Sequence, residues 1–409
     1  MMSYLSSCLN AKMVVVNLIK EIGKISRLEI SGLTGIKASS LTGLVAELLN
    51  EGIVRECAKN EIPKPEKISK GRRPTLLQIN PQIGTIIGVH IDHTSVRSAN
   101  MDFQGNIKNY IKKEFSLPLS QSEIIAKSLE STKEIMCADS KSQNNQITGI
   151  GVGVVGVVSS QEGKVFSFPK VEKWQEVSLK EIFTSELHLP VIVEKATDAA
   201  ALGEKWLGAI QNINNALYVH LGEGISLGII IDGKLYRGIS GNAGELGHIT
   251  VVENGPMCYC GNYGCLERLA SAEAILSNVL DGLQNGVRPN ILDKADGKLE
   301  NVNMDVVIQA LEEEDRFVYN IMQNACKHIG LAVANAVNIF NPEIIIIGGG
   351  IIEKSNTCMS FIRDIIKTKT LLSSQKNLKI VGSCLDKKAP LIGAGSLVVD
   401  FTLNRLTER

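Results

Sequence analysis

The stretch G-E-L-G-H-I-T-V-V-E-N-G-P-M-C-Y-C-G-N-Y-G-C-L-E, residues 244–267, is the most informative segment of this 409-residue chain. It holds one histidine and three cysteines within eighteen residues: His248, Cys258, Cys260 and Cys265. One imidazole and three thiolates complete the tetrahedral coordination of zinc and leave no position for water, as in structural zinc sites. A disulfide or a group of buried free thiols is the alternative, which the spacing disfavours. The stretch therefore predicts a structural zinc ion.

Two glutamates flank the four ligands, Glu245 before His248 and Glu267 after Cys265. A single glutamate is usually a solvated residue or a helix cap, but a metal beside these two would hold both in place. The run G-E-L-G-H followed by C-x-C-G-x-x-G-C-L-E resembles the signature of the ROK family, which contains sugar kinases and sugar-responsive repressors. The resemblance implies that Glu245, His248 and Glu267 contact the hydroxyls of a sugar, and that His248 also ligates zinc.

The composition is that of a globular protein, with 44% hydrophobic and 21% charged residues. The length suggests two or three domains. No eighteen consecutive residues are apolar, so we expect no membrane span, and the apolar patch near the N-terminus lacks a basic leader and a cleavage site. Nine cysteines without a regular framework are typical of a reducing cytoplasm. We interpret the six outside the zinc set as small buried hydrophobic residues.

Charge is distributed unevenly, although the net charge of the chain is zero. Residues 1–80 carry twelve Lys or Arg against seven Glu, a net of +5, so the remaining residues carry −5. A basic N-terminal part on a mildly acidic body predicts that only the first part meets nucleic acid.

Three helices are expected in the first fifty residues. Apolar residues recur at helical spacing over residues 11–24. Ser26 and Glu29 form a capping box for a second helix, which ends at Gly35. A third helix is expected over residues 37–50.

Two strands, over residues 53–56 and 76–79, follow the helices with a basic loop between them. Three helices and then a two-stranded hairpin is the order of a winged helix-turn-helix. A helical bundle that touches no DNA is the alternative, against which the basic loop argues. The runs S-R-x-E-I at 26–30, E-L-L-N-E-G-I-V at 47–54 and G-R-R-P at 71–74 resemble the DNA-binding half of ROK repressors.

The third helix is expected to lie in the major groove of double-stranded DNA. Its outward residues are Lys37, Ser39, Ser40 and Gly43. Short side chains of this kind bond phosphate or several bases and give little direct readout. Arg72 and Arg73 are expected in a narrow minor groove, where A·T-rich tracts concentrate negative potential.

From residue 85 onward, strands, helices and glycine loops alternate. Strands are expected over residues 85–89, 96–101, 147–158, 191–193, 216–221, 228–231 and 343–347, and helices over 122–138, 197–207 and 318–340. This order resembles the two-lobed actin-like ATPase fold of the ROK family over essentially all of residues 84–409. The predicted fold class is therefore α/β. The expected domains are a winged helix of residues 1–80, a first lobe of 81–196 with a C-terminal helix over 388–409, and a second lobe of 197–387 with the zinc site.

Three departures from the kinase pattern of the family predict that the chain is not an enzyme. ROK kinases carry D-x-G-G-T, but residues 90–94 read H-I-D-H-T, with Asp92 and His93 in place of glycines that approach phosphate. The resemblance puts the catalytic aspartate at Ala196, so the general base is missing. Glu223 stands where the family has threonine in a second phosphate loop.

The leading interpretation is a cytoplasmic, zinc-containing transcriptional repressor of sugar-metabolism genes. It is expected to bind a palindromic operator as a homodimer or homotetramer, and a sugar or sugar-phosphate effector in a catalytically inactive body. Lys170 and Lys195 stand where the family has asparagine, and together with Ala196 they predict an anionic effector. Drift at an unused pocket rim is the alternative. Two rival functions are an active ROK sugar kinase with an appended DNA-binding domain and a DNA-bound structural protein with a closed, ligand-free body.

Overall fold

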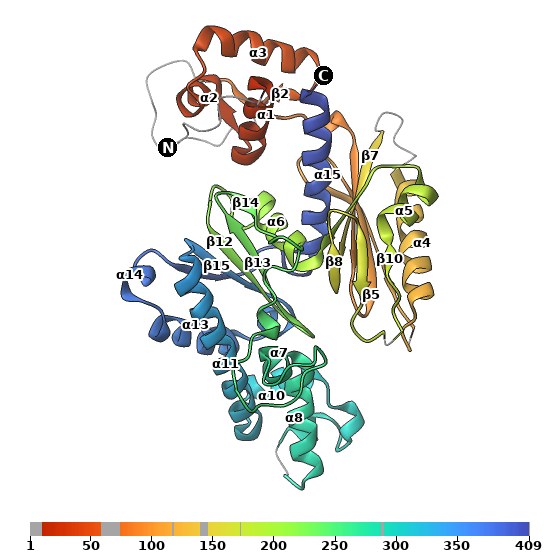
Figure 1. Cartoon of the computed structure of the whole chain (residues 1–409), viewed down its shortest axis with the longest axis vertical. Coiled ribbons are helices and arrows are strands. Elements are labelled where there is room, and N and C mark those ends of the chain that lie inside the picture. The colour runs from red at the N-terminus through yellow and green to blue at the C-terminus, as the bar shows by residue number, and fades with distance from the viewer. Residues whose placement is uncertain are drawn as a thin grey trace. The chain divides into compact units, whose positions relative to one another are not determined.

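The structure, a computed structural model, describes residues 10–58, 74–116, 118–139, 146–171, 173–287 and 290–408 (Figure 1). The chain forms two compact units, one of Met1–Ala196 with Leu391–Arg409 and one of Thr197–Pro390. Each unit contains one five-stranded sheet. Within the described ranges, no helix combines the length and the apolar character needed to cross a membrane.

The N-terminal part of the first unit contains the three expected helices and a small sheet. Its elements are α1 (Ala11–Ile22), β1 (Ile25–Ser26), α2 (Arg27–Thr34), α3 (Ala38–Asn50), β2 (Val54–Glu56) and β3 (Leu76–Ile79). The predicted capping box of Ser26 and Glu29 starts α2, and Gly35 ends it in the left-handed conformation. The two predicted strands, β2 and β3, pair antiparallel as expected, and the unpredicted β1 adds a third strand in the order β1-β3-β2. Residues 59–73, with the basic loop, lie outside the described residues.

The main sheet of the first unit has the strand order β11-β7-β4-β5-β6. Its strands are β4 (Thr85–Ile91), β5 (Ser95–Met101), β6 (Ile107–Glu114), β7 (Ile147–Val154) and β11 (Val191–Lys195). β4, β5 and β6 form an antiparallel meander, and β7 and β11 add to it in parallel. Helices α4 (Gln121–Asp139) and α5 (Leu179–Leu187) pack against this sheet.

The single strand predicted over residues 147–158 is two strands in different sheets. β7 ends at Val154, and β8 (Val157–Ser159) pairs with β9 (Lys164–Ser167), which pairs in turn with β10 (Val177–Ser178). Gly156 makes the break, since its φ is 113° and a Cβ there would lie 2.1 Å from the Ser167 carbonyl oxygen. Only glycine tolerates both conditions.

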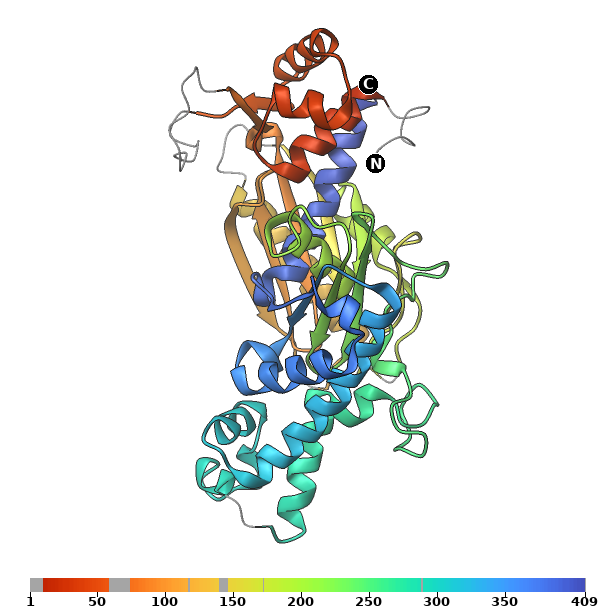
Figure 2. The same ribbon diagram turned by 90° about the vertical axis from the view of Figure 1, so that its left-hand side faces the viewer.

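The C-terminal helix α15 (Ala389–Thr407) returns to the first unit and packs on β4 and β7. The contact is so close that an added Cβ at Gly88 would lie 2.4 Å from the Leu391 carbonyl oxygen, and one at Gly151 would lie 1.8 Å from that of Ala394. Figures 1 and 2 both show α15 continuing from this sheet to the N-terminal helices.

The second unit repeats the strand order of the first. Its sheet has the order β14-β13-β12-β15-β16, with β12 (Ala216–Leu221), β13 (Ile225–Ile231), β14 (Lys234–Leu235), β15 (Ile344–Gly348) and β16 (Lys379–Gly382). An antiparallel meander is again extended by two parallel strands. This repetition is what the resemblance to the two-lobed ATPase fold implies.

Helices enclose the core of the second unit. They are α6 (Ala196–Leu207), α7 (Leu266–Ala270), α8 (Ala272–Gln284), α9 (Ile291–Lys294), α10 (Met304–Glu312), α11 (Arg316–Phe340), α12 (Gly350–Glu353), α13 (Asn356–Lys369) and α14 (Leu372–Gln375). Ile329 and Val333 of α11 and Ile362 of α13 are fully buried in one apolar cluster with sheet residues. Burial of such side chains stabilises the unit and fixes the loops that carry the candidate site.

Candidate metal and effector site

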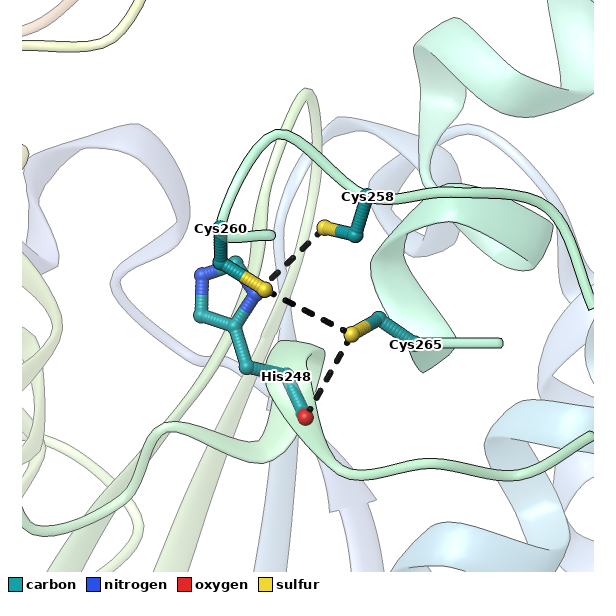
Figure 3. A group of neighbouring side chains, drawn as sticks. All are labelled: His248, Cys258, Cys260 and Cys265. Carbon is teal, nitrogen blue, oxygen red and sulfur yellow. Dashed lines mark hydrogen bonds between the residues drawn. The ribbon is translucent and has the colours of Figure 1, made fainter. Parts of the chain in front are cut away.

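The four predicted zinc ligands lie together in the second unit (Figure 3). His248 closes a short 3-10 helix, η3 (Leu246–His248), Cys258 and Cys260 lie in the following loop, and Cys265 precedes α7. Their ligand atoms all lie within 4.8 Å of one another.

The spacing of these atoms fits zinc. Cys260 Sγ and Cys265 Sγ are 3.7 Å apart, and His248 Nδ1 lies 3.7 Å from Cys258 Sγ. A tetrahedron with Zn–S bonds of about 2.3 Å has edges of about 3.8 Å between sulfurs, and of about 3.6 Å between sulfur and a ring nitrogen. The cysteines are free thiols, so the disulfide alternative does not describe this structure.

Glycines shape the loop that carries the thiols. Gly264 has a φ of 67°, and a Cβ there would lie 1.6 Å from the Val252 carbonyl oxygen. The backbone N–H of Cys258 donates to the Asn262 carbonyl at 2.8 Å, which closes the turn containing Cys260. The left-handed Gly264 and the turn from Cys258 to Asn262 therefore bring all three sulfurs close together.

The thiols differ in acidity before a metal binds. Burial raises the pKa of Cys265 to about 12 and also raises the pKa of Cys258. The backbone N–H of Asn262 contributes most to lowering the pKa of the exposed Cys260. Because thiolates are the zinc ligands, loading this site must release protons.

Among the remaining cysteines, only part of the sequence interpretation is confirmed. Cys326 and Cys358 are buried in the apolar core of the second unit. Cys137 and Cys384 are exposed, so their interpretation as buried residues is wrong. The composition alone does not show whether a given cysteine is buried or exposed.

Glu267 lies beside the predicted zinc ligands, and both of its carboxylate oxygens accept hydrogen bonds. Its Oε2 accepts a hydrogen bond from the Ile225 N–H at 2.7 Å, and its Oε1 accepts one from the Tyr259 hydroxyl at 2.7 Å. A Cβ at Gly224 or Gly247 would lie 3.0 Å from Oε2, so both glycines allow the carboxylate its place. Glu267 is therefore fixed against the loop after β12.

Tyr259 is a site residue that sequence reasoning missed. Its hydroxyl lies 3.2 Å from His248 Nε2 as well as contacting Glu267. Burial of the hydroxyl end and the neighbouring carboxylate hold the pKa of Tyr259 far above its ordinary value, although the residue as a whole is exposed. The available signal was an aromatic residue between two cysteines that are predicted zinc ligands.

The other predicted effector residues divide between the two units. Glu245 precedes η3, and its carbonyl oxygen accepts a hydrogen bond from the His248 N–H at 3.1 Å. It is therefore close, in sequence and in space, to the four predicted zinc ligands, which are called the metal group below. Lys195 ends β11 and is buried, and Lys170 has a φ of 65°. Both lysines belong to the first unit, and the metal group belongs to the second.

Asp92, which is predicted to replace a glycine of the kinase phosphate loop, has a local structural role. Asp92 accepts hydrogen bonds from the backbone N–H groups of Thr94 and Ser95, each at 2.8 Å. Burial acts to raise its pKa, but the charges of His90 and Arg97 and the bond from Thr94 outweigh it, so the pKa of Asp92 is strongly lowered. A phosphate approaching these amides would meet a carboxylate already bound to them.

The predicted DNA-contacting residues on α3 are exposed. Lys37 is the N-cap of the helix, and Ser39, Ser40 and Gly43 lie on its solvent side. The buried residues of the same helix are Leu41, Val45 and Leu48. Arg72 and Arg73 lie outside the described residues, so their predicted contact with the minor groove stays a prediction.

Sequence comparison identifies relatives along almost the whole chain. The ROK family profile matches residues 86–400. The xylose repressor of Caldicellulosiruptor bescii is 32% identical over 395 residues, which cover 96% of each chain. The N-acetylglucosamine repressor of Escherichia coli O157:H7 is 27% identical and covers 95% of this chain and 92% of that one.

Structure comparison also identifies ROK family proteins. A ROK family transcriptional regulator, described as a homolog of the E. coli MLC protein, has a TM-score of 0.79 at 28% identity and covers 97% of this chain and 98% of that one. A ROK family glucokinase from Streptomyces griseus, in complex with glucose and AMPPNP, has a TM-score of 0.66 at 28% identity and covers 77% of this chain and 99% of that one. The likeness to the regulator must therefore include residues before 86, and the family profile does not cover those residues.

Proposed function

The chain belongs to the ROK family, and on this premise we propose that it is a sugar-responsive, DNA-binding transcriptional repressor. The observation that carries this function is the extent of the likeness. The relatives named as repressors match 95% or more of the chain, so they include the part before residue 86 where no ROK body lies. A repressor needs that additional part, whereas a kinase does not.

The N-terminal part is proposed to be the winged helix-turn-helix, with residues 1–80 as a separate domain. The support is its order of three helices and a small sheet, with four exposed residues on α3 available to a major groove. Two copies related by a two-fold axis would read a palindromic operator, so the proposed assembly is a homodimer or homotetramer in the cytoplasm. A·T-rich flanks suit Arg72 and Arg73 in a minor groove.

The body is proposed to bind the sugar through Glu245, His248 and Glu267. This proposal is supported by the position of Glu267, whose Oε2 is held by the Ile225 N–H. Its Oε1 takes no part in that bond and accepts a hydrogen bond from a hydroxyl, that of Tyr259. A preorganised carboxylate binds a hydroxyl with little loss of side-chain entropy. The effector class is a sugar or a sugar derivative.

Structural zinc is proposed to hold this group together through His248, Cys258, Cys260 and Cys265. The distances between the four ligand atoms support the assignment. Zinc would supply a fixed, tetrahedral cross-link between the side chains of this loop, whose backbone hydrogen bonds already hold it in shape. The metal would thereby position His248 and, through the start of α7 directly after Cys265, Glu267.

The body is proposed to have no kinase activity. Ala196 offers no general base, and Asp92 already occupies the amides of its own loop. The likeness to the S. griseus glucokinase complex favours the second candidate, an active kinase with an appended DNA-binding domain. The occupied amides and the missing base argue against that candidate.

Selection of bound duplexes from a randomised DNA pool tests the function. The full-length protein should recover a site with two inverted half-sites, and one member of a sugar panel should change its affinity for that site. ATP-dependent phosphorylation of any sugar in the panel would establish the second candidate instead. Recovery of no sequence, with no response to sugar, would contradict the proposed function.

A further inference from the structure

Tyr259 reaches into the group of residues proposed to receive the sugar. Its hydroxyl donates a hydrogen bond to Glu267 Oε1 at 2.7 Å and lies 3.2 Å from His248 Nε2. The ring stands edge-on to the imidazole, with 5.3 Å between the ring centroids. All three residues belong to the second unit. A single phenol oxygen thus contacts two of the three groups assigned to sugar hydroxyls.

The hydrogen bonds form one consistent chain of donors. His248 Nδ1 faces Cys258 Sγ at 3.7 Å, so Nδ1 is the ring nitrogen on the side of the metal ligands. With Nδ1 as a ligand, Nε2 carries the ring proton and donates it to the oxygen of Tyr259, whose own hydroxyl donates to Glu267. A sugar hydroxyl has the same donor and acceptor capacity as this phenol.

The ring of Tyr259 has little else to hold it. The residue is 74% exposed, so its burial contributes little free energy to the observed position. The loop backbone is secured separately by the bridge between Met257 and Tyr263 and by the turn from Cys258 to Asn262. The side chain can therefore turn outward while the backbone and the metal ligands stay in place.

We propose that Tyr259 is a built-in competitor of the effector: a sugar hydroxyl replaces the phenol hydroxyl on Glu267 and His248, and the ring turns outward. The inference rests on the proposed function, because it needs a sugar to bind at this group. It specifies the ligand as a polyol with a hydroxyl that donates to Glu267 and accepts from His248. A deoxy analogue without that hydroxyl leaves Tyr259 in place and binds more weakly.

Removal of the phenol hydroxyl tests the competition. Calorimetry is performed on zinc-loaded, full-length protein with D-xylose, D-glucose and N-acetyl-D-glucosamine as probes. Tyr259→Phe keeps the ring and should bind the preferred sugar about three- to tenfold more tightly, since no hydrogen bond to Glu267 has to be broken first. Tyr263→Phe, in the same loop, is the matched control and should bind like wild type. Equal or weaker binding by Tyr259→Phe overturns the proposal.

A second readout distinguishes this inference from the proposed function itself. If neither wild type nor Tyr259→Phe binds any of the three sugars, the sugar response fails and this inference fails with it. If wild type binds a sugar but Tyr259→Phe gains nothing, only this inference fails. Loss of zinc from Tyr259→Phe would also overturn it, because the hydroxyl would then be positioning His248 for the metal.

Fluorine NMR follows the movement directly. With 3-fluorotyrosine at position 259, a saturating sugar should move the resonance toward that of free 3-fluorotyrosine in water, because the label leaves Glu267 and His248. An unmoved resonance in protein that binds the sugar contradicts an outward turn of the ring. Glu267→Gln should weaken sugar binding at least tenfold while leaving zinc content unchanged, which ties the response to this carboxylate.

Discussion

The side-chain amide of Asn10 donates a hydrogen bond to the carbonyl oxygen of Thr407 at 2.9 Å, so the start of α1 is tied to the last turn of α15. A second tie follows along the same pair of helices, where Lys20 forms an ion pair with Asp400. The other end of α15 packs on β4 and β7 through Gly88 and Gly151. Helix α15 thus connects the main sheet of the first unit to the N-terminal helices.

We expect Gly151→Ala to lower the stability of the protein by at least about 1–3 kcal/mol, the usual cost of overpacking. The new Cβ would lie 1.8 Å from the Ala394 carbonyl oxygen, which can move only with the backbone of α15. Chemical denaturation followed by circular dichroism measures the change in free energy of unfolding.

Gly32→Ala in α2 is the matched control, since no atom lies within 4 Å of the Cβ it adds. It should be neutral or should stabilise by up to about 1 kcal/mol, because alanine favours the helix. Equal effects of the two substitutions would show that the close contact of α15 does not limit stability.

Purified protein should contain about one zinc per chain, and Cys260→Ser should lose it. Metal analysis by mass spectrometry measures both. The variant should also lose its response to sugar while its N-terminal helices keep their circular dichroism and DNA binding. Cys137→Ser, at an exposed thiol outside the metal group, should keep its zinc. Native protein without zinc would contradict the site.

Zinc affinity should fall as the pH falls. Burial raises the pKa of Cys265 to about 12, so this thiol carries a proton in the metal-free protein that zinc must displace. The apparent affinity should therefore change roughly tenfold per pH unit for each thiol that is still protonated. Competition with a zinc-binding dye between pH 6 and 8 measures the slope. A flat profile would mean that the thiols are not the ligands.

No sugar should be phosphorylated in the presence of ATP and magnesium, and Ala196→Asp alone should not restore the reaction. The substitution returns a possible base, but Asp92 still holds the Thr94 and Ser95 amides. Release of ADP in a coupled assay across a sugar panel is the measurement. Turnover by the wild-type protein would overturn this assignment.

Arg72→Ala combined with Arg73→Ala should weaken operator binding and flatten its dependence on salt. Each lost phosphate contact lowers the slope of log affinity against log salt by roughly 0.9. Fluorescence anisotropy across a salt series measures both quantities. Lys376→Ala with Lys379→Ala removes two exposed cations of the second unit and should leave the slope unchanged. Identical slopes for the two double variants would make the G-R-R-P run a linker.

Local signals in the sequence predicted local structure well. The capping box of Ser26 and Glu29 needs four consecutive residues, and both of its hydrogen bonds are formed. Strand β1 was missed because two residues show no periodicity, and its pairing with Leu76 and Leu77 is made across fifty residues of chain. The break at Gly156 also depends on a contact made only in the fold, with the carbonyl oxygen of Ser167.

The candidate site shows the same limit. Cysteine and histidine spacing predicted the metal group, because those four residues lie close together in the chain. The place of Tyr259 between two predicted zinc ligands was the available signal, but that place does not show which residues its hydroxyl contacts. Only the folded loop brings its hydroxyl to Glu267, eight residues away. The division into three domains stays a prediction, as does the anionic character of the effector.

The last prediction concerns that character. Relatives named as xylose and N-acetylglucosamine repressors leave open whether the effector of this chain is neutral or charged. Lys195 and Lys170, with Ala196 in place of the aspartate of the kinases, favour a sugar phosphate or sugar acid. A charge-assisted contact contributes about 1.5–3 kcal/mol, so a hexosamine 6-phosphate should bind about ten- to a hundredfold more tightly than the hexosamine. Calorimetry on the pair, repeated with Lys195→Ala and with the control Lys205→Ala, decides the matter. If the neutral sugar binds as tightly as its phosphate, or if Lys195→Ala leaves the phosphate's affinity unchanged, the effector is recognised through its hydroxyls alone.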